Sequence, residues 1–143
     1  MEKNRLLVVY NICGISGRDN LLYYIPAIHK LLDNIGKNDR IIISGCITQP
    51  RHKEELKRVF GGTIDFVWTD EVRTISFTFN RAVRESVKKH GPFEGYVYVD
   101  SGCRLDNPNT INDLYETYTT TDAHMVSTLT DDDSGAEWWF GDS

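Results

Sequence analysis

Short apolar runs alternate with helical patterns along this 143-residue sequence, and the alternation limits the folds that it can adopt. The runs Leu6–Tyr10 and Arg40–Gly45 are apolar over most of their length and rich in β-branched residues. Such continuous runs are typical of strands that are buried on both faces of a sheet. Further strands are predicted at Thr63–Trp68, Tyr96–Val99 and Ala123–Leu129.

Helical patterns fill the first two intervals between these strands. The first predicted helix begins at Asp19 or Asn20 and ends before Gly36, and Pro26 either kinks it or marks its true first turn. The second, Arg51–Arg58, carries both signs of charge. We therefore expect it to be a solvated helix that packs only its last turn.

Two more helices are predicted further along the chain. The third extends from Thr74 or Ser76 to about His90. Its buried face is expected to be a stripe at helical spacing, formed by Ile75, Phe79, Val83 and Val87 with Ala82 alongside. The fourth is expected to be capped by Asp106 and to contain Pro108 in its first turn.

The order of these elements predicts the fold class. Strands that alternate with helices imply βαβ units with right-handed crossovers. We therefore expect an α/β fold, a Rossmann-like three-layer α/β/α sandwich with a mostly parallel sheet, in a single domain over residues 1–143. If the strands run in the spatial order 3-2-1-4, the loop Asn11–Gly17 faces the loop Asp100–Cys103 across a crevice at the switch point.

Composition and charge exclude several classes of protein. The net charge of −5 argues against a broad nucleic-acid interface, which needs a basic face. No apolar run approaches the roughly 20 residues of a membrane-spanning helix, and the first residues do not form a signal peptide. A cytoplasmic protein, or part of a longer one, is expected. Three cysteines, Cys13, Cys46 and Cys103, have no metal-ligand spacing and no Cys-x-x-Cys pair, so they are expected to fill turns and buried corners.

The stretch Gly95–Asp106 is the main candidate for a binding site. The strand Tyr96–Val99 continues directly into Asp100, and Ser101 and Gly102 then let the backbone turn. Ligands of open α/β sheets bind at the carboxyl ends of the strands. A carboxylate at this position is where a nucleotide, a sugar or a metal ion would be met.

Three segments in this order resemble the nucleotide-binding half of GT-A-fold glycosyltransferases. Leu7–Asn11 is similar to the opening strand of that family, and Phe79–Ala82 is similar to its Asn-containing helix. Tyr96–Gly102 occupies the place of the strand that ends in Asp-x-Asp. The resemblance covers most of the chain, although the dinucleotide fingerprint Gly-x-Gly-x-x-Gly is absent.

The resemblance implies a site for a nucleotide-diphospho-sugar, most commonly a UDP-sugar, whose sugar passes to an unknown glycan, lipid or protein acceptor. The opening loop and the region of Asp70 and Arg73 would hold the base, ribose or diphosphate. Asn80 would order the pocket, and Asp100 would approach the ribose and a Mn²⁺ or Mg²⁺ ion. The implied donor-site residues are Tyr10, Asn11, Cys13, Asp70, Arg73, Asn80, Asp100, Ser101 and Gly102, with Asp100 as the metal ligand.

Gly102 departs from the family pattern, because the second aspartate of Asp-x-Asp is expected there. Asp106 is an alternative ligand; otherwise the diphosphate supplies most ligands, or the domain does not depend on a metal. Asp100 either contacts a ligand or orders its own loop. Arg73 contacts a phosphate or pairs with Glu71 or Asp70.

The catalytic base is not identified by these patterns. The late carboxylates Asp131–Asp133, Glu137 and Asp142 are its only candidates, and the Asp131–Asp133 run also fits a solvated acidic turn. The alternative function is a non-catalytic doubly wound module that binds a partner. In that interpretation Asp100 is structural and the aromatic segment Trp138–Phe140 forms an interface.

Overall fold

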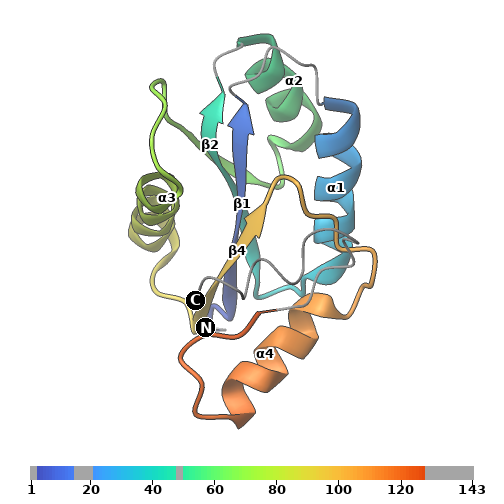
Figure 1. The fold of residues 1–143 in the computed structure, drawn as a ribbon, viewed down its shortest axis with the longest axis vertical. Coiled ribbons are helices and arrows are strands. Elements are labelled where there is room, and N and C mark those ends of the chain that lie inside the picture. Colours follow the sequence, from blue (N-terminus) through green and yellow to red (C-terminus); the bar gives the residue numbers. More distant parts are fainter. Residues whose placement is uncertain (1–2, 15–20, 48–49, 128–143) are drawn as a thin grey trace, which may run out of the picture. The chain divides into compact units, whose positions relative to one another are not determined.

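The computed structural model describes residues 3–14, 21–47 and 50–127. The chain divides into two compact units, residues 1–108 and residues 109–143. The first unit contains the sheet and the helices that cover it (Figure 1). Its elements are β1 (Leu6–Gly14), α1 (Leu21–Asn34), β2 (Arg40–Ile47), α2 (Pro50–Phe60), β3 (Asp65–Trp68), α3 (Ile75–His90) and β4 (Gly95–Asp100).

The sheet confirms the predicted topology. In the described part of the chain, four strands, all parallel, lie in the order β3-β2-β1-β4. The central strand β1 pairs on both sides, with Val9 opposite Ile42 of β2 and Tyr98 of β4. α3 covers one face, and α1 and α2 cover the other, so the fold is the expected three-layer α/β/α arrangement (Figure 1).

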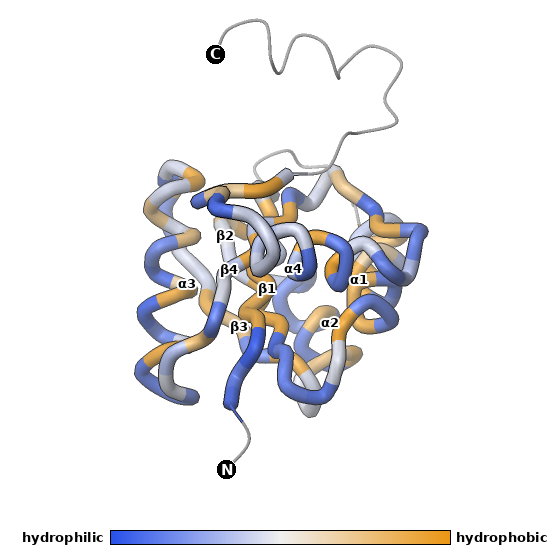
Figure 2. Tube along the Cα trace, turned by 90° about the horizontal axis from the view of Figure 1, so that it is seen from below, coloured by the Kyte–Doolittle hydropathy of each residue, from blue (hydrophilic) through white to orange (hydrophobic). Residues whose placement is uncertain are grey.

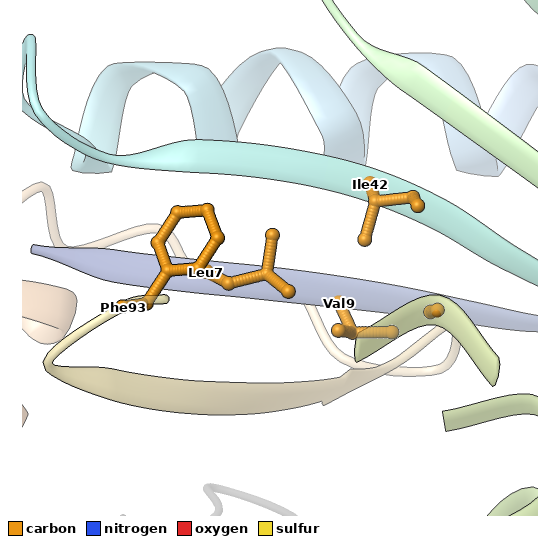
Figure 3. Packing of buried hydrophobic residues seen from close by; sticks show 5 residues of the cluster. Leu7, Val9, Ile42 and Phe93 are labelled. Atoms are coloured by element: carbon orange, nitrogen blue, oxygen red, sulfur yellow. The ribbon is translucent and has the colours of Figure 1, made fainter. Parts of the chain in front are cut away.

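The face of the sheet toward α3 carries one part of the core. Leu7, Val9 and Ile42 cluster there with Ala82 of α3 and with Phe93, which precedes β4 (Figure 3). Apolar side chains of β3 and α3 surround this cluster, namely Val67, Phe79, Val83 and Val87. Strand residues alternate between faces, so Leu6, Val8 and Tyr10 lie on the opposite face, toward α1 and α2. Figure 2 shows hydrophobic residues gathered along β1, between α3 on one side and α1 and α2 on the other.

α2 packs along its whole length, and the expectation that only its last turn packs is wrong. His52, Leu56 and Phe60 are all buried. Their spacing of four residues places them on one side of the helix. The charged residues between them make this apolar side hard to recognise in the sequence. Pro26 lies inside α1 and does not mark its first turn. The start predicted at Asp19 or Asn20 falls outside the described residues.

α3 presents a different stripe to the sheet from the one predicted. Its buried residues are Thr78, Ala82 and Ser86, so the prediction is confirmed for Ala82, whereas Ile75 is 54% exposed. The predicted Phe79, Val83 and Val87 are half-buried at the side of the contact. Small side chains at every fourth position let the helix approach the sheet, and the larger ones fill the space beside it.

The second unit contains α4 (Thr110–Thr120) within its described part. The predicted cap at Asp106 is wrong: its carboxylate accepts a hydrogen bond from Nε of Arg104 at 3.0 Å, and the helix follows Asn109. Residues 123–127 form no strand, so the strand predicted at Ala123–Leu129 is wrong over its described part. No helix in the described ranges is long and apolar enough to cross a bilayer.

The buried Asp39 fastens the amino end of β1. Its carboxylate accepts hydrogen bonds from Nε and Nη2 of Arg5 at 2.8 and 2.6 Å. It also accepts the backbone N–H groups of Leu6 and Gly36, at 3.1 and 2.8 Å. Both oxygens are therefore satisfied although the side chain is fully buried.

Replacing Asp39 tests this anchor. Asp39→Ala leaves two backbone donors and one guanidinium without their acceptor, and we expect the free energy of unfolding in urea to fall by about 3 kcal/mol. Asp106→Ala removes an exposed carboxylate that is also paired with an arginine, so it should change stability by less than about 0.5 kcal/mol. Equal losses in the two variants would contradict the role of burial.

Replacing Ser86 tests the small-residue stripe of α3. The Ser86 hydroxyl is buried and has no hydrogen-bond partner within the described part of the chain. Ser86→Ala removes this cost and favours the helix, so the free energy of unfolding should rise by about 1 kcal/mol. A loss of stability in the same urea titration would show that the hydroxyl is satisfied in solution.

Candidate functional site

The carboxyl ends of β1 and β4 bring Asn11 and Asp100 side by side. Asn11 lies opposite Ser44 of β2 and Asp100 of β4, and the Ser101 N–H donates to the Asn11 carbonyl at 3.0 Å. β2 and β4 lie on opposite sides of β1, so the order in which the strands follow one another in the sheet reverses at β1. This is the switch point at which open α/β sheets bind ligands.

The Asn11 side chain is buried and is held by α3 and β4. It is only 3% exposed, and its Oδ1 accepts the hydroxyl of Thr78 at 2.8 Å. It also forms a hydrogen bond with the hydroxyl of Tyr98. On the other side, Ser44 donates to the Thr78 carbonyl at 2.9 Å. A polar row therefore crosses the sheet at its carboxyl edge and is satisfied within the protein.

Asp100 stands exposed at the end of this row. Its Oδ1 accepts the Tyr98 hydroxyl at 3.2 Å, and its Oδ2 accepts the Gly102 N–H at 3.0 Å. The Asp100 carbonyl accepts the Cys103 N–H at 2.9 Å. The carboxylate thus orders its own turn, one of the roles predicted for it. Each oxygen keeps a further lone pair for a ligand.

The absence of a side chain at position 102 follows from this turn. A Cβ atom on Gly102 would lie 3.0 Å from Oδ2 of Asp100, which is a tight contact. A second aspartate would therefore press on the first. The departure from Asp-x-Asp fits the geometry of the turn observed here.

The electrostatics of this edge keep its hydroxyl and thiol groups protonated. Burial, followed by the charge of Asp100, raises the pKa of Tyr98 to about 12. Burial also raises the pKa of the Cys103 thiol, and Asp100 adds to the effect. Tyr98 therefore acts as a hydrogen-bond donor at neutral pH, and Cys103 is not activated as a nucleophile.

Arg73 and Asp70 follow β3 at the same edge of the sheet. Nη2 of Arg73 lies 3.0 Å from Oε2 of Glu71, so the predicted ion pair with Glu71 is formed. The guanidinium also lies over the Phe77 ring, 4.9 Å from its centre. Asp70 pairs with Lys53 at 3.4 Å. These pairs are exposed and therefore weak, so a phosphate can replace Glu71 at little cost.

Asn80 does not join the polar row, and Thr78 does. Asn80 is exposed on α3, whereas Thr78 is buried against Asn11. Next to Asn80, Nη1 of Arg81 donates to the Trp68 carbonyl and the Thr69 hydroxyl, at 3.0 and 3.2 Å.

Sequence reasoning missed Thr78 and Tyr98. Tyr98 is two residues before Asp100 in a strand, and this spacing indicates that the two side chains share a face. Thr78 lies four residues before Ala82, so the two share a side of α3. These spacings were available signals for both residues.

Tyr10 and Cys13 complete the predicted donor site. Tyr10 is buried on the face opposite Asn11, and its hydroxyl donates to the Ser101 carbonyl at 3.1 Å. Cys13 lies in β1 opposite Cys46, but its side chain is outside the described residues, as is the loop beyond Gly14. The structure thus brings together Tyr10, Asn11, Asp100, Ser101 and Gly102.

The described residues at this edge do not form a protein-held cation site. Asp100 is one carboxylate whose two oxygens already accept hydrogen bonds, and Asp106 is paired with Arg104. Across the described ranges, no group of three or more His, Cys, Asp or Glu residues could hold a metal ion. Mg²⁺ needs about six oxygen ligands in near-octahedral geometry, so this donor set does not fit it. The implied Mn²⁺ or Mg²⁺ requirement stays a prediction.

A groove between α1 and α2 is a separate feature of the first unit. It has a volume of about 410 Å³ and is lined by Leu21, Leu22, Ile25, Pro26, Arg51 and Glu55. Leu22 is 90% exposed there. An apolar side chain this exposed is often part of a surface that binds another molecule.

Comparison with known proteins does not assign the chain to a family. No family profile matches the sequence, and neither does any curated protein. The candidate late carboxylates and the aromatic segment Trp138–Phe140 lie outside the described residues. The functional argument therefore rests on the carboxyl edge of the sheet.

Removing the hydroxyl of Thr78 tests the polar row. Thr78→Val leaves the buried Asn11 oxygen without its donor, and the free energy of unfolding should fall by about 1–2 kcal/mol. Thr117→Val makes the same change on α4, where the hydroxyl is exposed and donates to the Asp113 carbonyl. In urea titrations the control should lose less than half as much. Similar losses would show that the Asn11 contact contributes little.

Proposed function

We propose that the carboxyl edge of the sheet binds a nucleotide-diphospho-sugar and that the domain takes part in transferring the sugar to an acceptor. The observation that carries this proposal is the juxtaposition of Asp100 and Asn11 at the switch point between β1 and β4. An exposed carboxylate is fixed there by a buried polar row. The resemblance to glycosyltransferases favours a uridine nucleotide and a glycan, lipid or protein acceptor.

The free lone pairs of Asp100 suit the two neighbouring hydroxyls of a ribose. Each carboxylate oxygen already accepts one hydrogen bond from the protein, which leaves the group pointing in one direction. A diol can then donate one hydrogen bond to each oxygen without the entropy cost of fixing the Asp100 side chain on binding. Tyr98, whose pKa is raised, remains a donor beside it.

Arg73 is the side chain that the resemblance suggests for neutralising a diphosphate. The N–H groups of Ser101, Gly102 and Cys103 are already engaged within the protein, so the turn offers no backbone nest for phosphate. A departing nucleoside diphosphate develops negative charge that a cationic group must stabilise. The exposed guanidinium of Arg73 can exchange Glu71 for a phosphate oxygen.

A partner-binding module is the second candidate. The groove between α1 and α2, with Leu22 exposed at its wall, favours this alternative. The two functions differ in a simple assay. A module should form a dimer or a complex and release no nucleotide from a sugar donor, whereas an enzyme should release it slowly.

Asp100→Asn tests the proposed site. Titration calorimetry of UDP and UDP-glucose, with and without Mn²⁺, measures affinity in the wild type and the variant. Loss of the charged acceptor should weaken binding by about tenfold or more. Asp33→Asn changes an exposed carboxylate on α1, outside the candidate site, and should leave the affinity within about twofold. A wild type that binds neither nucleotide, and no GDP-sugar, would refute the proposal.

A further inference from the structure

The turn after β4 has its backbone N–H groups tied to its own strand and to β1. The Ser101 N–H donates to the Asn11 carbonyl at 3.0 Å. The Gly102 N–H donates to Oδ2 of Asp100 at 3.0 Å, and the Cys103 N–H donates to the Asp100 carbonyl at 2.9 Å. These bonds hold the carboxylate and the turn together, so the direction of one depends on the other.

The carbonyl groups of the same turn are held from the opposite face of the sheet by two tyrosines. The hydroxyl of Tyr10, in β1, donates to the Ser101 carbonyl at 3.1 Å. The hydroxyl of Tyr23, in the first turn of α1, donates to the Gly102 carbonyl at 2.8 Å. Surface turns commonly leave their carbonyl groups to water. Here two different elements supply the donors.

The two tyrosines differ in what else they do. Tyr10 is 1% exposed and belongs to the core, whereas Tyr23 is 39% exposed and its ring contacts that of Tyr24 edge-on, with centres 6.3 Å apart. Burial, followed by the nearby Cys103, raises the pKa of the Tyr23 hydroxyl, so it stays protonated and keeps donating. The Tyr23 hydroxyl is thus a tie to the turn that can be removed without opening the core.

We propose that Tyr23 is a positioning residue for Asp100. The Gly102 carbonyl belongs to the same planar peptide as the Cys103 N–H, which donates to the Asp100 carbonyl, so Tyr23 fixes the peptide that closes the Asp100 turn. Tyr10 holds the Ser101 carbonyl and thus the preceding peptide, whose Gly102 N–H donates to Oδ2 of Asp100. With the turn closed by Tyr23, the carboxylate keeps the direction that a ligand meets. The effect on ligand binding rests on the proposed function; the effect on the turn does not.

The mechanism requires that Tyr23 act through Asp100 and not on the ligand. Without the hydroxyl, the Gly102 carbonyl turns to water, and the Gly102–Cys103 peptide that closes the turn loses its restraint from α1. The carboxylate then spends time in other rotamers, and a ligand has to order it again on binding. The apparent affinity is then the intrinsic affinity multiplied by the fraction of time that the carboxylate spends in the arrangement that binds the ligand.

Tyr23→Phe tests the tie directly. Amide exchange of Cys103, measured by NMR, should become about threefold to tenfold faster, because its peptide group loses one hydrogen bond. The affinity for the sugar nucleotide that the wild type binds, UDP-glucose in the first instance, should fall by a similar factor. Unchanged amide exchange would overturn the proposal.

Tyr96→Phe is the matched control. Tyr96 is 41% exposed, lies in β4 itself, and its hydroxyl accepts the Phe93 N–H at 3.4 Å, away from the turn. This variant should leave both the exchange of the Cys103 amide and the nucleotide affinity unchanged. Equal effects in both variants would show that a general loosening of β4, and not the tie, is responsible.

The double variant Tyr23→Phe/Asp100→Asn separates positioning from direct contact. If Tyr23 acts through Asp100, the double variant should bind as weakly as Asp100→Asn alone. A further loss of the same size would show that Tyr23 contacts the ligand, and would overturn the proposal. If the wild type binds no sugar nucleotide, the proposed function fails, and the amide exchange alone decides whether Tyr23 holds the turn.

Discussion

The need to satisfy the buried amide of Asn11 is the constraint on which the carboxyl edge of this fold depends. β1 pairs with a strand on each side, so its backbone groups are occupied and the side chain must find partners above the sheet. Thr78 and Tyr98 supply them. Because Thr78 must reach the sheet, α3 turns its smallest residues inward, and the large apolar residues move to the sides of the contact.

The topology could be predicted from the sequence because both of its signals are local. Central strands are buried on both faces, so Leu6–Tyr10 and the run from Ile41 read as continuous apolar stretches, and their alternation with helices implies parallel pairing. The faces of the helices were harder to predict. Apolar residues recur with the right period in α3, but the period does not fix which side touches the sheet. In α2, the buried His52 was hidden among charged neighbours.

The candidate site was predictable in part for the same reason. Asn11, Asp100, Ser101 and Gly102 follow from strand ends and strand order alone. The position of Asn80 outside the polar row and the omission of Thr78 have one cause, since the side of α3 that faces the sheet differs from the side predicted. Which side of α3 faces the sheet is determined only by a tertiary contact, here the hydrogen bond between Thr78 and Asn11.

The position of β4 explains why its last turn needs ties from both layers. Among the described residues β4 is an edge strand that pairs only with β1, so its carboxyl end has half of the backbone support that β1 and β2 receive there. Tyr98 reaches Asp100 from the α3 face, and Tyr10 and Tyr23 reach the turn from the α1 face. Hydrogen bonds from both layers thus replace the support that a second neighbouring strand would give the Asp100 turn. On the proposed function, a ligand at the switch point would meet one arrangement of this turn.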